Sequence, residues 1–172
     1  MKVYDGSQTE QESVGQPERK KVGIAEYAVT TDEAVLTTSG LGSCIGVALY
    51  DPDSNTAGLV HVMLPRHDDG EGARAKFADT GVEVLLEEME RAGARRRSME
   101  AKIAGGSDML DFSENGSSIG SRNAAIVRET LAANDVPILG EDVGGDYGRS
   151  LRLEAATGDL IVKSASQGTA TL

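Results

Sequence analysis

Helical periodicity is confined to two stretches of this 172-residue chain, which limits the folds that it can adopt. Residues 75–92 carry apolar side chains at intervals of three to four, with glutamates between them, and predict a helix that stops at Gly93. Residues 121–133 predict a second helix, ending at Asn134. The other ordered segments are predicted to be short strands bounded by turn residues: 33–38, 44–50, 58–64, 101–104, 138–143, 151–155 and 160–163. Because a purely parallel doubly wound sheet needs more crossover helices, we expect an α/β fold, a layered sandwich of mixed, largely antiparallel strands with helices packed outside.

The chain is expected to form a single domain with less ordered ends. Its length fits one domain, since domains usually have roughly 100–200 residues. Residues 1–21 are mostly Gln, Glu, Ser, Gly and Pro and show no apolar periodicity before Val22, so they predict a disordered lead-in. We therefore place the domain at 22–163 and expect 164–172 to be a flexible tail.

Acidic residues outnumber basic residues along the chain. There are 28 Asp and Glu against 17 Lys and Arg, which gives a formal net charge of -11 at pH 7. Each contact with a nucleic-acid or lipid phosphate requires a cation, so the composition argues against nucleic acid and anionic membrane as partners. Dense carboxylates keep a surface hydrated while salt screens their repulsion, so the composition indicates the high-salt cytoplasm of a halophilic archaeon.

Cysteine content and hydropathy bear on where the protein works. One cysteine cannot form an intramolecular disulfide, which is typical of a reducing cytoplasm. No stretch approaches the roughly 18 apolar residues of a membrane span, and the N-terminus lacks the apolar core of a signal peptide. We therefore predict a cytoplasmic protein without direct membrane insertion.

The single cysteine lies in a glycine-rich segment, 37–46, which reads TTSGLGSCIG. A dinucleotide-binding loop would need its third glycine at position 45, which is Ile45. Cys44 instead follows a small, flexible turn that can present its sulfur, and backbone N–H groups near Gly42 and Ser43 can bind a reacting oxygen. The alternative is an inert cysteine buried as a small hydrophobic residue, which is the commoner case for a single cytosolic cysteine.

A histidine in the next predicted strand favours the reactive interpretation. If 44–50 and 58–64 pair as an antiparallel hairpin, opposite residues have numbers that sum to about 108, which places Cys44 near Leu64. His61 then lies within a few residues of the thiol. An imidazole beside a thiol can act as the base that forms the thiolate, which free cysteine, with a pKa of about 8.5, supplies only sparsely at neutral pH.

A third group usually orients the imidazole of such a pair. Thr38, six residues before the cysteine, is our candidate for that role, although a threonine at a strand end is more often only a β-former. A closed zinc site is not favoured, because the chain has one Cys and two His, and the second, His67, lies in a polar loop.

These segments resemble a known family. The motifs T-x-S-G-L-G-S-C-I-G-V-A-L-Y-D over 37–51 and G-L-V-H-V-M-L-P over 58–65 are similar to those of the CheD family of chemoreceptor glutamine deamidases. The resemblance spans about 22–163 and includes further segments at 76–80, 102–106, 119–123, 141–145 and 148–149. One departure is Ser107-Asp108 after the glycine pair, where an alanine is commoner in the family.

The resemblance implies a Cys-His-Thr catalytic set, which falls here on Cys44, His61 and Thr38. It also implies an α/β layered sandwich that hydrolyses selected glutamine side chains on chemoreceptor helices to glutamate, which regulates chemotaxis. CheC-type phosphatases are the expected partners. The reaction would pass through a cysteine thioester and need no metal or organic cofactor.

Two other functions remain open at this point. A CheD-like chain could act as a regulatory module that binds a CheC-type phosphatase with little catalysis, although the presence of all three candidate residues argues against a loss of activity. A cysteine amidase acting on a small-molecule amide would use the same chemistry. Comparing activity on free glutamine with activity on an intact receptor separates these functions.

Overall fold

The computed structural model describes residues 17–68, 72–108 and 118–172 and places them in two sheets and two α-helices. One five-stranded sheet has the order β11-β10-β9-β4-β2, and the other, also five-stranded, has the order β3-β6-β5-β7-β8. The strands are β2 (Arg19–Lys21), β3 (Tyr27–Thr30), β4 (Val35–Leu41), β5 (Ile45–Asp51), β6 (Thr56–Val62), β7 (Glu100–Gly105), β8 (Ile138–Val143), β9 (Arg149–Glu154), β10 (Asp159–Ser164) and β11 (Gly168–Thr171). The helices are α2 (Ala78–Arg91) and α3 (Ile119–Ala133), with short 3-10 turns η1 (Arg74–Lys76) and η2 (Arg96–Ser98).

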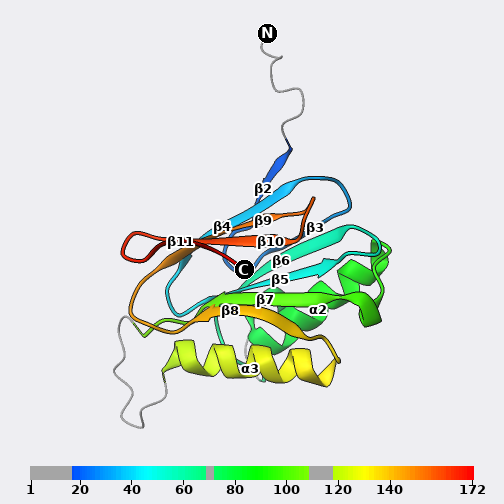
Figure 1. Cartoon of the computed structure of the whole chain (residues 1–172). Coiled ribbons are helices and arrows are strands. Elements are labelled where there is room, and N and C mark those ends of the chain that lie inside the picture. The colour runs from blue at the N-terminus through cyan, green and yellow to red at the C-terminus, as the bar shows by residue number, and fades with distance from the viewer. Residues whose placement is uncertain (1–16, 69–71, 109–117) are drawn as a thin grey trace.

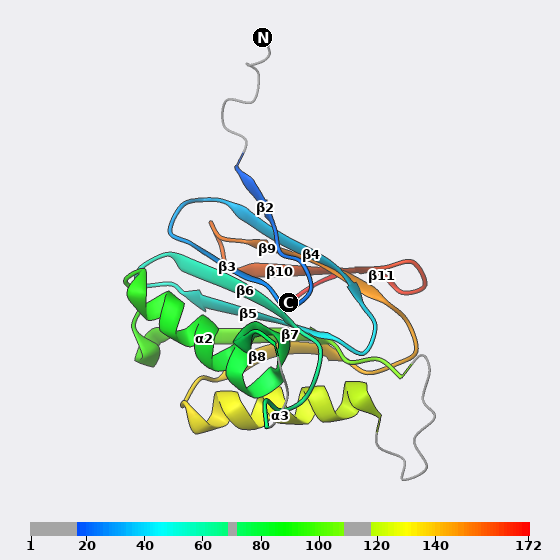
Figure 2. The same cartoon turned by 180° about the vertical axis from the view of Figure 1, so that it is seen from behind.

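The two sheets lie face to face, and both α-helices pack on the outside of the sheet that contains β5 (Figure 1). The view from behind shows the same arrangement, with α2 along β5 and β6 and α3 near β7 and β8 (Figure 2). Within the described ranges, only the pairs β2–β4 and β7–β8 are parallel, and the other neighbours are antiparallel. The predicted layered sandwich of mixed, largely antiparallel strands is therefore confirmed.

The β5–β6 hairpin lies at the centre of the molecule and is buried on both faces. Every residue of β6, and all but one of β5, is buried. One face packs against the helices in an apolar core, and the other packs against the opposite sheet in a second core. The second face is lined by small residues, and a Cβ added at Gly46 would lie 2.3 Å from Cδ1 of Leu151. The two sheets therefore approach closely at Gly46.

The fold extends beyond the predicted domain at both ends. Most of the predicted lead-in, residues 1–16, lies outside the described residues, but β2 already begins at Arg19 rather than after residue 21. The prediction of a flexible tail over 164–172 is wrong where β11 pairs with β10. All four residues of β11 are exposed, so main-chain hydrogen bonds hold the strand and no apolar alternation marks it in the sequence.

The turn that closes the hairpin is organised by a buried carboxylate. Asp51 is completely buried; its Oδ1 accepts from the amide of Asp53 at 2.9 Å, and its Oδ2 accepts from the hydroxyl of Ser54 at 2.8 Å and the amide of Arg95 at 2.9 Å. Burial by itself raises the pKa of Asp51, but the hydrogen bonds from Arg95 and Ser54 outweigh it and hold the pKa below its usual value. The charged carboxylate thus ties the β5–β6 turn to the segment after α2.

We predict that Asp51→Ala lowers the free energy of unfolding by about 2 kcal/mol or more, because three part-buried donors lose a charged, buried acceptor. Urea unfolding in molar KCl measures the change. Asp53→Ala, at an exposed position in the same turn, is the matched control and should change the value by less than about 0.5 kcal/mol. Equal effects of the two substitutions would contradict the organising role of Asp51.

Candidate active site

The hairpin register brings Cys44 and His61 to the same side of the second sheet. Gly46 pairs with His61 and Ile45 with Val62, so the numbers of opposite residues sum to 107, one less than predicted. Cys44, one residue before β5, then lies across from Met63 rather than Leu64. Because every second residue of a strand faces the same side, Cys44 and Gly46 share a face with His61. The thiol is a diagonal neighbour of the imidazole, with only a glycine opposite His61.

Thr38 reaches the same place from the opposite sheet. The pairing of β4 with β9 shifts between Thr38 and Leu41, where two residues of β4 oppose one of β9, and Gly40 in this bulge has φ of +73°. The extra residue lets both Thr38 and Leu41 point into the space between the sheets, where both are buried. The Oγ1 of Thr38 lies 2.8 Å from Nδ1 of His61. The bulge therefore completes a contact between the two sheets.

The hydrogen bonds of Thr38 determine the tautomer of His61. The hydroxyl donates its one proton to the carbonyl oxygen of Val22 at 2.7 Å, so it can only accept from Nδ1 of His61. Nδ1 therefore carries the proton, and Nε2 carries a free lone pair. Nε2 is buried and has no hydrogen-bond partner among the described residues. The imidazole is held ready to take a proton on the nitrogen that Thr38 does not contact.

Burial acts on the pKa values of both groups. It raises the pKa of the half-buried Cys44 thiol and lowers the pKa of His61, because both charged forms are poorly solvated there. At neutral pH the resting pair is therefore a neutral thiol and a neutral imidazole.

The turn before Cys44 is held through its carbonyl groups. Three successive oxygens accept hydrogen bonds from a neighbouring loop and from α3: Gly42 O from Ser107 N at 2.8 Å, Ser43 O from Asn123 Nδ2 at 2.9 Å, and Cys44 O from Gly106 N at 2.8 Å. The amide of Gly42 donates within the turn, to the oxygen of Gly40 at 3.1 Å. The amides of Ser43 and Cys44 donate to none of the described residues. These two N–H groups are therefore free to bind a reacting oxygen.

Glycines allow the loop after β7 to approach Cys44 closely. Gly105 has φ of +118°, and a Cβ there would lie 2.2 Å from the carbonyl oxygen of Cys44. A Cβ at Gly120, in the first turn of α3, would lie 2.5 Å from the carbonyl oxygen of Ser107. Backbone thus packs directly on backbone on the helix side of the cysteine, which leaves little freedom for the turn.

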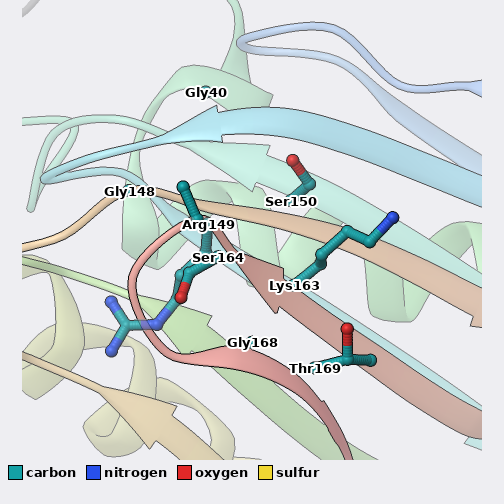
Figure 3. A pocket seen from close by; sticks show the side chains of 9 residues that line it. Gly40, Gly148, Arg149, Ser150, Lys163, Ser164, Gly168 and Thr169 are labelled. Carbon is teal, nitrogen blue, oxygen red and sulfur yellow. The ribbon is translucent and has the colours of Figure 1, made fainter.

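A hollow of about 600 Å³ beside the bulge does not contain the candidate residues. Figure 3 shows Ser150, Lys163 and Thr169 projecting into it from three strands, while the side chain of Arg149 extends away from them. The guanidinium of Arg149 pairs with Asp142 at 3.1 Å and donates to the carbonyl oxygen of Gly105 at 3.3 Å. This arginine therefore braces the loop behind Cys44, and the hollow itself is lined by neither Cys44, His61 nor Thr38.

The structure also bears on the predictions about a zinc site and about a membrane span. Within residues 17–68, 72–108 and 118–172, no three His, Cys, Asp or Glu side chains gather as a metal would require. His67 packs its ring edge-on against Phe77, with the centroids 4.5 Å apart. None of the helices in the described part of the chain has the length and apolar character needed to cross a bilayer.

Comparison with known proteins identifies the family. The family model described as "CheD chemotactic sensory transduction" matches residues 63–164. A Haloarcula marismortui protein named "Probable chemoreceptor glutamine deamidase CheD" is 67% identical over 173 residues, which cover 100% of both chains. The chain belongs to the CheD family. Its Bacillus subtilis relative, named "Chemoreceptor glutamine deamidase CheD", is 41% identical over 157 residues, covering 88% of this chain and 95% of the relative.

Solved structures support the fold of this CheD-family chain. The crystal structure of a DUF152-family protein from Neisseria meningitidis aligns with a TM-score of 0.53 at 12% identity. The alignment covers 80% of this chain and 67% of that protein. At such low identity the likeness concerns the arrangement of the strands and helices alone.

Sequence reasoning named Thr38 as the partner of His61, and the two side chains lie within hydrogen-bond distance, but it did not assign the groups that hold the turn at Cys44. Asn123 and Gly105 lie in segments noted only for their resemblance to the family, 119–123 and 102–106. Gly105 has a φ of +118°, which favours glycine, and the buried amide of Asn123 donates to the carbonyl oxygen of Ser43. Each residue therefore has a structural role in its motif. A glycine pair directly after a predicted strand was the available signal for the close approach.

We predict that Gly105→Ala lowers the free energy of unfolding more than Gly93→Ala, by about 1 kcal/mol or more. Both glycines have φ above +110°, but a Cβ at Gly93 meets nothing within 4 Å, whereas one at Gly105 meets the carbonyl of Cys44. The difference in urea unfolding therefore isolates the clash from the backbone strain. Equal losses would show that the loop around Cys44 can move aside at no cost.

Proposed function

We propose that this chain hydrolyses the side-chain amide of selected glutamines on chemoreceptors to glutamate and ammonia. Cys44 is the nucleophile, His61 is its base, and Thr38 orients the imidazole. The observation that carries the proposal is the hydrogen bond from Nδ1 of His61 to Thr38, which leaves the buried Nε2 atom unpaired. The names of the CheD relatives supply the substrate class.

The reaction begins with transfer of the thiol proton to Nε2 of His61 as the sulfur of Cys44 attacks the amide carbon. The oxygen of the tetrahedral intermediate accepts hydrogen bonds from the free amides of Ser43 and Cys44. The imidazolium then protonates the amide nitrogen, the C–N bond breaks, and ammonia leaves a thioester. Water, deprotonated by His61, attacks the thioester, and glutamate and the thiol are released.

Thr38 contributes to this cycle beyond fixing the tautomer. Positive charge develops on the imidazole in both steps, inside a region where burial disfavours charge. The hydroxyl oxygen of Thr38 accepts from Nδ1 and stabilises that charge. A neutral acceptor leaves the resting imidazole uncharged, which agrees with its lowered pKa.

The same proposal includes partner and compartment. The family resemblance implies a CheC-type phosphatase as a partner of this chain. A free thiol persists in a reducing cytoplasm, where the cytoplasmic helices of chemoreceptors are accessible.

We predict that Cys44→Ala lowers the deamidation rate by at least about 1000-fold while leaving thermal unfolding nearly unchanged. The protein is incubated with a receptor cytoplasmic fragment in molar KCl, and mass spectrometry measures the gain of one mass unit at glutamine. The wild-type protein and a sample without enzyme are run beside it. Free glutamine as a competing substrate tests for a small-molecule amidase. Substantial deamidation by the variant would remove Cys44 from the mechanism.

The acidic limb of kcat/KM against pH should have its midpoint below about 6.5, the ordinary pKa of histidine. The base works only when deprotonated, and burial lowers the pKa of His61, so activity is lost only at a lower pH. Thr38→Val removes the acceptor that stabilises the imidazolium; it should shift the midpoint further down and reduce kcat about 10- to 100-fold. An unchanged profile in Thr38→Val would contradict the role assigned to this hydroxyl.

A further inference from the structure

A buried side chain outside the proposed catalytic set holds the turn before Cys44 and the strand end after His61. Asn123 lies in the second turn of α3 and has no exposed surface. Its Nδ2 donates to the carbonyl oxygen of Ser43 at 2.9 Å and to that of Met63 at 3.1 Å. Ser43 precedes the nucleophile, and Met63 follows the base by two residues.

The orientation of this amide is set by its surroundings. Two carbonyl oxygens face it, and only the NH₂ end of an asparagine can donate to both. The Oδ1 atom is then buried without a partner among the described residues, which costs free energy. A side chain that only filled this space would not leave a polar atom unbonded. The two donated bonds are therefore the reason for an asparagine at this position.

The bond to Ser43 acts on the amide of Cys44. The carbonyl of Ser43 and the N–H of Cys44 belong to one peptide group, and the described chain has no cis peptide bond. In a planar trans peptide the C=O and N–H point in opposite directions. Asn123 holds the oxygen from the side of α3, so the N–H of Cys44 is directed away from the helix, toward the side of the sheet that carries His61.

We propose that Asn123 is a positioning residue that aims the N–H of Cys44 at the oxygen of the tetrahedral intermediate. The inference rests on the proposed deamidation. Asn123 does not touch the substrate, and it does not serve to activate the thiol, which depends on His61. Its effect is confined to the step in which negative charge develops on the amide oxygen, because only that charge gains from an aligned donor.

Asn123→Asp tests this role, because it keeps the shape of the side chain while replacing the NH₂ donor by an oxygen that faces two carbonyls. Loss of one oxyanion donor costs about 100- to 1000-fold in kcat, so a misaligned donor should lower kcat at least about 30-fold with KM within about threefold. The rate of Cys44 alkylation by iodoacetamide should stay within about threefold of the wild-type rate, since substitution at sulfur forms no oxyanion.

Asn134→Asp is the matched control on the same helix. Asn134 follows the last residue of α3, donates to Thr130 O at 2.8 Å and accepts from Arg96 at 2.7 Å. It thus has as many side-chain hydrogen bonds as Asn123, at the other end of the helix. Its substitution should leave kcat and alkylation within about threefold of the wild type. Asn123→Ala, which introduces no charge, should likewise lower kcat while leaving the rate of Cys44 alkylation near the wild-type rate.

Three outcomes would overturn the inference. If kcat of both Asn123 variants stays within about threefold of the wild type, the amide of Cys44 needs no positioning. If kcat and the alkylation rate fall together, Asn123 acts on the thiol or on the fold. If neither variant unfolds cooperatively, Asn123 is needed for folding and has no separate role in positioning the amide of Cys44. A wild-type protein without deamidation would instead remove the proposed function and this inference with it.

Discussion

The close packing of the first sheet on the β5–β6 hairpin is the contact on which the rest of the structure depends. It requires the absence of a side chain at Gly46, because a Cβ there would lie 2.3 Å from Cδ1 of Leu151 in the opposite sheet. A polar ring placed in that interface cannot be hydrated, so His61 needs a partner from the opposite sheet. Thr38 provides it only because a bulge in β4 turns the hydroxyl inward. The geometry of the site is therefore a consequence of how the sheets meet.

The polar groups of the turn at 42–44 and of His61 are either hydrogen-bonded or unpaired. Carbonyl oxygens of the turn at 42–44 and the Nδ1 atom of His61 are hydrogen-bonded. The N–H groups of Ser43 and Cys44 and the Nε2 atom of His61 have no partner within the described residues. Unpaired buried groups are usually avoided, because they lose water without gaining a bond. Ser43 is exposed and Cys44 is half-buried, so among these groups the Nε2 atom of His61 is the buried one, and it supports the proposed role of His61 as a base.

Much of the fold and the contact between Thr38 and His61 could be predicted from the sequence, and the failures have physical causes. Two apolar runs separated by a polar turn predict the β5–β6 hairpin. Loop length alone does not fix its register, and the predicted sum of paired residue numbers was one too high. The edge strand β11 and the β4 bulge depend on main-chain pairing, which leaves little trace in residue type. Asn123 contacts a residue 80 positions away, and no local pattern predicts such a contact.

The neutral resting pair has a consequence for the survival of the enzyme in an oxidising cell. Peroxides attack the thiolate, and the first product is a sulfenic acid that a second cysteine can rescue by forming a disulfide. This chain contains one cysteine, so it has no internal route of repair. Burial raises the pKa of the Cys44 thiol and so keeps the proton on its sulfur. The partial burial of Cys44 thus lowers the fraction of thiolate that a peroxide can attack.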